Sequence, residues 1–209
     1  MLELFKKSLQ GQFEAALSML GACVSQCPDD KWEDRVGSYP FWHVAYHALF
    51  YADLYLSRDH AAFEPRPFYR EDYQYFGKRP SPPHEPVVAD VVYDRATLAG
   101  YVAFCRNKAA QTIAAETDES LAGPSGFWWY QIGRAEFHLN NVRHVQHHAA
   151  QMSLSLRNSA GIGIDWVGSG WRDQALVPRG NQSRESQRPG RAKFRTRHGL
   201  TSNRWRPGA

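Results

Sequence analysis

Apolar residues recur at steps of three and four positions in four separate segments of the chain, which is the period of an amphipathic helix. Pro40 stands before the second segment and suits a first helical turn, with Ser38 or Tyr39 near the cap. In the first segment the apolar stripe consists of Leu2, Phe5, Leu9, Phe13, Leu17 and Leu20. We therefore expect four helices, over residues 2–26, 41–59, 94–116 and 134–157.

Two connections join these segments in a way that favours a bundle. Residues 61–93 form a long, proline-rich crossover that is too apolar for a free linker, so we expect it to cover one end of the bundle. In the shorter connection, residues 117–133, we expect Trp128 and Trp129 to plug the bundle end at which they lie. The aromatic side chains of the crossover include Phe63, Phe68, Tyr69, Tyr73, Tyr75 and Phe76. The pattern predicts an all-α fold, a four-helix bundle with a long second crossover.

The helical period is lost after Trp166, where Arg, Ser, Pro and Gly dominate. Such a segment buries too little apolar surface to offset the entropy lost on ordering, so we expect a bundle domain over 1–170 and a disordered, Arg-rich tail over 171–209. The tail holds ten Lys and Arg against two acidic residues, whereas the first 170 residues carry a net charge of about −4. The formal net charge of +4 thus comes from the tail, and we expect no specific nucleic-acid binding.

The composition narrows the class of protein. Apolar residues make up 43% of the chain, which suits a globular core, and no run of 18 uncharged apolar residues predicts a membrane span. The N-terminus lacks the layout of a secretory signal. Cys23, Cys27 and Cys105 are too few for a disulfide framework, so we expect buried thiols and a cytoplasmic protein. Neither a GxSxG elbow nor a phosphate-binding glycine loop is present in the sequence.

Three histidines gather in the fourth predicted helix. At about 100° per residue, His148 lies about 40° from His144, and both border the apolar face that contains Val145 and Met152. His147 falls on the other side and should meet solvent. The i, i+4 spacing brings two imidazoles within about 6 Å at their Cβ atoms, close enough to share one ion.

A third ligand must come from another helix. His47 lies near the centre of the apolar arc of the second segment, and His43 lies one turn earlier as a rival. We favour His47. Three neutral imidazoles and a water would make an open, catalytic type of metal site. The alternative is that these histidines are packed, hydrogen-bonded core residues, because an HxxxH pair arises by chance and lacks the Glu of the zincin pattern.

The remaining histidines are weaker candidates. His60 and His84 lie in predicted loops and should be solvated, whereas His138 shares the buried arc and should pack or hydrogen-bond. Asn141 lies on the same arc as His148 and could orient a ligand or the substrate.

The stretches "HLNNVRHVQHHAAQMSLSLR" and "FWHVAYHALFYADLYLS" resemble the last and the second core helices of the DinB/YfiT-like superfamily. The resemblance covers about residues 1–170 and matches at His47, His144, His148 and Gln151. It implies a four-helix bundle that holds a divalent metal, zinc or nickel, on three histidines, commonly as a homodimer. Relatives include metal-dependent hydrolases and transferases that use a low-molecular-weight thiol. The basic tail has no counterpart in that family.

Two functions follow as hypotheses. The first is a divalent-metal-dependent enzyme in which His47, His144 and His148 activate a water or a low-molecular-weight thiol against a small-molecule substrate. The second is a non-catalytic bundle that binds a metal or a partner. Non-specific, salt-sensitive association of the basic tail with nucleic acid is a remote third.

Overall fold

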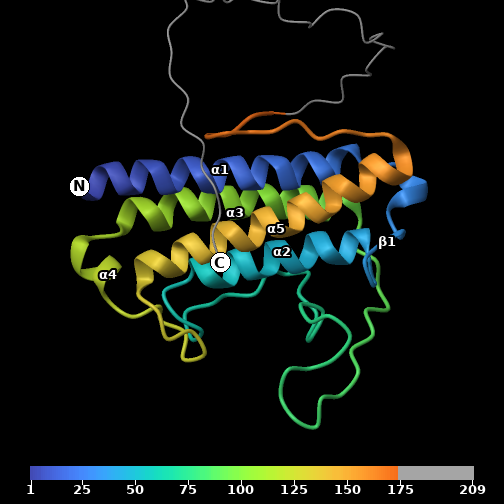
Figure 1. The fold of residues 1–209 in the computed structure, drawn as a ribbon. Helices are drawn as coiled ribbons and strands as arrows, with labels where there is room; N and C mark the ends of the chain where they lie inside the picture. Colours follow the sequence, from blue (N-terminus) through green and yellow to red (C-terminus); the bar gives the residue numbers. More distant parts are fainter. Residues whose placement is uncertain (174–209) are drawn as a thin grey trace, which may run out of the picture. The chain divides into compact units, whose positions relative to one another are not determined.

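A computed structural model of the chain describes residues 1–173, and residues 174–209, where most of the expected tail falls, lie outside the described residues. The predicted all-α bundle is confirmed (Figure 1). The division at residue 170 stays a prediction. The long helices are α1 (Leu2–Gln26), α2 (Phe41–Leu56), α3 (Arg95–Ala115) and α5 (Arg134–Ala160). The short elements are a 3-10 turn (Asp29–Lys31), β1 (Arg35–Val36), β2 (Tyr39–Pro40) and α4 (Asp118–Ala122).

The four long helices surround one apolar core. Helix α1 packs against α3 and α5, and so does α2, which places α1 and α2 diagonally across the bundle. Each helix turns its apolar stripe inward because burial removes that surface from water, at about 25 cal/mol per Å². The largest fully buried side chains are Phe13, Phe41, Trp42, Tyr46, Tyr101, Phe127 and Phe137. No helix in the described part of the chain is both long and apolar enough to cross a bilayer.

The element bounds differ from the sequence-based expectation at several points, and α2 ends at Leu56, three residues before its predicted end. Pro40 does not enter α2 but pairs with Arg35 in a two-stranded hairpin, and the helix begins at the next residue. Residues 118–122, expected as loop, form α4, because Thr117 and Ser120 make a reciprocal capping box. Helix α5 continues three residues beyond its predicted end and stops at Gly161, whose φ of 67° suits a residue without a Cβ atom.

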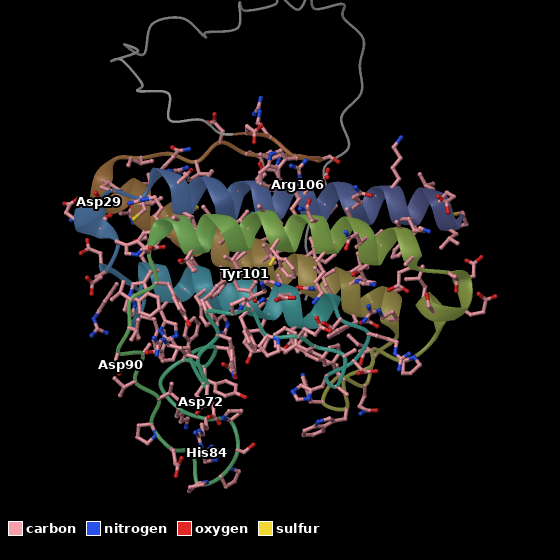
Figure 2. All side chains as sticks on the ribbon, turned by 180° about the vertical axis from the view of Figure 1, so that it is seen from behind. Asp29, Asp72, His84, Asp90, Tyr101 and Arg106 are labelled. Atoms are coloured by element: carbon pink, nitrogen blue, oxygen red, sulfur yellow. The ribbon has the colours of Figure 1, made fainter. Side chains whose placement is uncertain are left out.

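The sequence predicts that the long crossover between α2 and α3 covers one end of the bundle, and this prediction is wrong. The crossover packs along the side of α2. Its Phe63 and Tyr69 rings contact Phe50, and Phe76 contacts His47. Figure 2 shows Asp72, His84 and Asp90 on this segment, beyond α2. These rings anchor the crossover on α2, and Phe68 contacts Tyr101 on α3 with ring centroids 5.2 Å apart.

The prediction that Trp128 and Trp129 plug the bundle end is wrong. Their side chains are 81% and 38% exposed, whereas Phe127 is 2% exposed and packs against Phe137 with ring centroids 5.1 Å apart. The turn at Gly126, with a φ of 89°, determines which ring points inward. A Cβ atom there would lie 2.0 Å from the Arg58 carbonyl oxygen, so only glycine fits.

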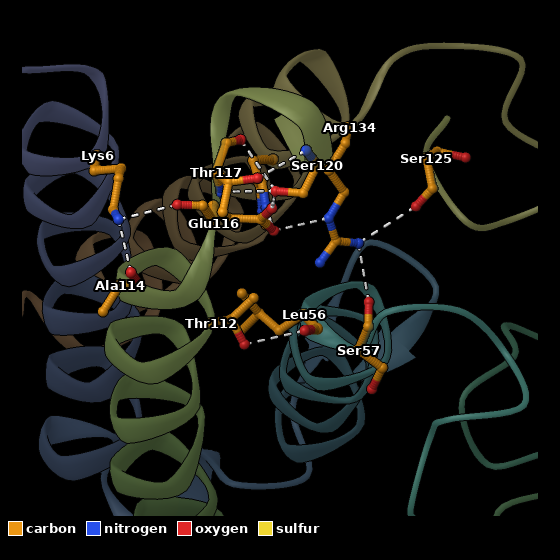
Figure 3. Close-up of polar contacts among 11 residues, drawn as sticks. Lys6, Leu56, Ser57, Thr112, Ala114, Glu116, Thr117, Ser120, Ser125 and Arg134 are labelled. Carbon is orange, nitrogen blue, oxygen red and sulfur yellow. Dashed lines mark hydrogen bonds and ion pairs between the residues drawn. The ribbon is translucent and has the colours of Figure 1, made fainter. Parts of the chain in front are cut away.

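A buried ionic cluster joins three helix ends (Figure 3). Arg134 donates from Nε to Glu116 at 3.0 Å and from a terminal nitrogen to the Ser57 carbonyl at 2.9 Å. His138 bonds the same Glu116 oxygen at 2.8 Å. Burial alone would raise the pKa of Glu116, but the hydrogen bonds from His138, Ser120 and Arg134 outweigh it and lower the pKa to about 2. The cluster holds the start of α5 in register with the ends of α2 and α3.

The last described residues run extended beside α1. Gly170 donates its backbone N–H to the Gly11 carbonyl at 2.9 Å. Arg106, labelled in Figure 2, lies over the Trp171 ring at 4.3 Å from its centroid. The segment thereby packs against the outer faces of α1 and α3, on the side of the bundle away from the histidines.

Candidate metal centre

Three histidines from two helices converge between α2 and α5. The Nε2 atom of His144 lies 3.3 Å from that of His47 and 3.2 Å from that of His148. The ligand atoms of the three residues all lie within 4.8 Å of one another. The pair on α5 is brought together by the i, i+4 step, and His47 joins it because α2 packs directly against α5. The structure therefore brings together the three residues that the sequence singled out.

The spacing of these nitrogens fits a metal ion. Nitrogens bound tetrahedrally at about 2.0–2.1 Å from an ion lie about 3.3–3.4 Å from one another. The two recorded separations are 3.3 and 3.2 Å. Among the described residues, these histidines are the group of three potential ligands whose donor atoms lie close enough together to hold one ion. Their three nitrogen donors suit zinc or nickel.

Hydrogen bonds from the outer ring nitrogens point the inner ones at the centre. His47 donates from Nδ1 to the Gln74 carbonyl at 2.6 Å, and His148 donates from Nδ1 to Gln151 Oε1 at 2.9 Å. A neutral imidazole carries one N–H, so both Nε2 atoms are left as bare acceptors. His144 can give its single proton to only one of them. A cation at the centre would satisfy all three lone pairs, which is a second indication that the residues fit an ion.

Burial keeps the three imidazoles uncharged. Desolvation, followed by the proximity of the other two rings, lowers the pKa of His47 to about 2. Burial, followed by the proximity of His148 and His147, lowers the pKa of His144 to about 3, and burial lowers that of His148 to about 4. At neutral pH all three imidazoles are therefore neutral, and a metal does not have to displace a second ring proton from any of them.

Aromatic rings enclose the centre on two sides. Phe76 stacks on His47 with ring centroids 3.9 Å apart. Tyr51 lies 4.9 Å from the His47 ring and 5.6 Å from the His144 ring. His148 is 7% exposed, while the other two histidines are half-buried, so the centre lies at the surface and remains reachable.

Comparison with known protein families identifies a match over residues 12–152 to the DinB superfamily. This region is more than half of the chain and contains the three histidines and Gln151. The chain belongs to the DinB superfamily. The resemblance read from the two helical motifs is thereby confirmed for this DinB-superfamily bundle. Comparisons with curated proteins and with solved structures gave no match.

The other histidines of this DinB-superfamily protein have different surroundings. His43, the rival ligand, is buried and bonds the Tyr73 carbonyl through Nε2 at 2.7 Å. His138 is fully buried and bonds Glu116, whereas His147 is exposed, as expected. His60 and His84 are exposed in loops.

Asn141 links the two helices that carry the histidines, and its orienting role toward a ligand or the substrate stays a prediction. It is fully buried, and its amide nitrogen donates to the Ala52 carbonyl at 3.2 Å. The bond joins α5 to α2 one turn from His144. Asn141 thus positions the helices that carry the histidines, and no bond from it to a histidine is recorded in the described residues.

Sequence reasoning missed a buried ion pair in the wall of the DinB-type bundle. Asp53 is fully buried, and its carboxylate accepts from Lys108 on α3 and, at 2.9 Å, from the Tyr101 hydroxyl. Lys108 also donates to the Ser57 hydroxyl at 2.9 Å. A lone acid inside the apolar run "ALFYADLYL" was the available signal, because a charge there needs a buried partner. Gln74 and Phe76, which both contact the His47 ring, lie in the irregular crossover, where no sequence pattern indicates such a contact.

Proposed function

We propose that this DinB-superfamily protein is a divalent-metal-dependent enzyme, with His47, His144 and His148 as the ligands. The observation that carries the proposal is that the His144 Nε2 atom lies 3.2–3.3 Å from the Nε2 atoms of the other two histidines, which are both aimed inward by bonds on the opposite ring nitrogen. Zinc and nickel suit an all-imidazole donor set. Three protein ligands leave a coordination position for a water or a low-molecular-weight thiol.

When bound, the ion would supply Lewis acidity and lower the pKa of such a water or thiol toward neutrality. The chain contributes the rest. Gln74 and Gln151 hold the orientation of their histidines, and Phe76 keeps water off one face of the His47 ring. Tyr51 contacts the rings of both His47 and His144 and adds an apolar surface next to the metal ligands. Hydrolysis of a small ester or amide, or transfer of a thiol to an electrophilic small molecule, fits this arrangement.

Activity in the full chain tests the proposal. Zinc- and nickel-loaded protein is assayed for hydrolysis of p-nitrophenyl acetate and for conjugation of glutathione to 1-chloro-2,4-dinitrobenzene. The same assays are run on His148→Ala and on the exposed neighbour variant His147→Ala. We expect turnover in the wild type and in His147→Ala that disappears after chelation and in His148→Ala. Turnover that survives both treatments would contradict a metal mechanism, and a wild type that takes up no ion would favour a partner-binding bundle.

A further inference from the structure

A hollow of about 510 Å³ lies beside the histidine centre, between the last turns of α5 and the β1–β2 hairpin. The hairpin contributes Arg35, Val36 and Gly37, and the helix contributes polar and apolar side chains. The residues of the helix are Gln151, Leu154, Ser155, Asn158 and Ser159. The hollow therefore offers one guanidinium group, two amides and two hydroxyls around a leucine.

Gln151 joins the hollow to the histidine centre. Its Oε1 atom accepts the Nδ1 proton of His148 at 2.9 Å, and the same side chain lines the hollow. Along α5, Gln151 lies about 5 Å from His148, and Ser159 lies about 16 Å from it, at about 1.5 Å per residue. A molecule roughly 10 Å long, the length of about three extended residues, would reach from the hollow to the centre.

The charge of the hollow selects an anion. Arg35 is its charged side chain, and no carboxylate lines it. Four other hollows of similar volume in the described residues each contain at least one Asp or Glu. The Arg35 guanidinium donates to the Ser38 carbonyl at 2.6 Å, and within residues 1–173 no ion pair with a carboxylate is recorded for it. Its other N–H groups are therefore available to a ligand.

We propose that this hollow binds the carboxylate end of a small, polar substrate or co-substrate whose other end reaches the histidine centre. One guanidinium balances one carboxylate charge and matches its planar geometry with paired N–H donors. The amides of Gln151 and Asn158 and the Ser155 hydroxyl suit hydroxyl or amide groups along the ligand, and the Ser159 hydroxyl, which donates its proton to the Ser155 carbonyl at 2.9 Å, can still accept one. The inference deepens the proposed function and rests on it for the role of the other end.

The carboxylate site is tested by NMR on the ¹⁵N-labelled full chain, with and without added zinc. Propionate is the probe, and propionamide is its neutral control. We expect saturable shifts of the Gly37 backbone amide and of the Gln151 and Asn158 side-chain amides with propionate, and not with propionamide. Arg35→Gln should abolish these shifts. Arg157→Gln, which removes an exposed arginine outside the hollow on the same helix, should retain them.

Equal shifts with both probes, shifts that persist in Arg35→Gln, or the absence of saturable shifts in the wild type would each overturn the inference. The metal-free sample separates this outcome from that of the proposed function. Propionate binding without any uptake of zinc would refute the metal enzyme and leave the anion site. Zinc uptake without propionate binding would refute the anion site and leave the metal site.

Discussion

The Nε2 atoms of His47 and His144 lie 3.3 Å apart, although 97 positions separate the two residues in the chain. Packing of α2 against α5 creates this contact, and the Asn141–Ala52 bond and the Phe76 stack fix its geometry. Two neutral imidazoles can share one proton in such a contact, but the addition of His148 leaves a lone pair without a donor. The fold therefore brings three Nε2 atoms together at a point where a cation would bind.

Gln151 should control metal affinity without being a ligand. Gln151→Ala removes the acceptor that orients the His148 ring, so we expect zinc affinity to fall about 10–100-fold with little loss of helix content. Gln151→Glu keeps an acceptor in place and should bind zinc at least as well as the wild type. Competition with a chromogenic chelator measures both. Equal losses in the two variants would show that the hydrogen bond to His148 is unimportant.

Metal binding should release almost no protons from the histidines at pH 6. The pKa of an ordinary histidine is about 6.5, so three such ligands would release about 2.3 protons at this pH. Here burial holds the pKa values at about 2, 3 and 4, so the rings are already neutral and zinc displaces no proton from them. Affinity should accordingly stay constant as the pH falls from 6.5 to 5 and should weaken only as the pH approaches 4.

Calorimetry in two buffers of different ionisation enthalpy counts these protons. A heat of binding that is independent of the buffer at pH 6 supports the buried, neutral centre. Release of two or more protons would mean that the metal-free imidazoles are solvated and that the histidines are less enclosed than the structure shows.

Lys108 should be essential to stability even though it is remote from the histidines. Lys108→Met leaves the fully buried Asp53 carboxylate with the Tyr101 hydroxyl as its recorded side-chain donor among the described residues. Breaking a buried pair in this way costs about 3–5 kcal/mol of unfolding free energy. Lys7→Met, at an exposed position of α1, should change it by no more than about 0.5 kcal/mol. Urea denaturation compares the two, and similar values for both would contradict the assigned role of the pair.

Phe127 should contribute far more to the free energy of unfolding than its neighbour Trp128. Phe127→Ala opens a cavity beside Phe137 and should cost about 3–5 kcal/mol. Trp128→Ala removes a ring that is 81% exposed and should cost less than about 0.5 kcal/mol. Thermal melts of both variants measure the difference. A larger loss of stability in Trp128→Ala than in Phe127→Ala would contradict this assignment and favour the prediction that Trp128 fills the bundle end.

The sequence predicted the helices well because their apolar stripes are regular. The α1 stripe from Leu2 to Leu20 needs no tertiary information, and the i, i+4 step places His144 beside His148 by helix geometry alone. The choice of His47 over His43 was less determined, since both lie on the inward arc of α2. Both rings bond a carbonyl of the crossover, but His43 does so through Nε2, whereas His47 does so through Nδ1 and leaves its Nε2 facing His144.

The irregular segments could not be predicted in the same way. No period tells which of three consecutive aromatic residues points inward at a turn, and the backbone of Gly126 decides it for Phe127. The crossover contributes a carbonyl from Gln74 and the Phe76 ring to the histidine centre, and both depend on where a loop settles on α2. Local sequence therefore specified the inner histidines, whereas long-range packing specified what surrounds them.

Metal stoichiometry of the wild type, His144→Ala and His147→Ala, measured by elemental analysis after zinc loading and gel filtration, tests the central claim most directly. The two variants differ by one turn of the same helix, and circular dichroism monitors their helix content. We predict one zinc per chain in the wild type and in His147→Ala, and none in His144→Ala with its helices intact. Full zinc retention by His144→Ala, or a wild type that binds none, would contradict the three-histidine centre.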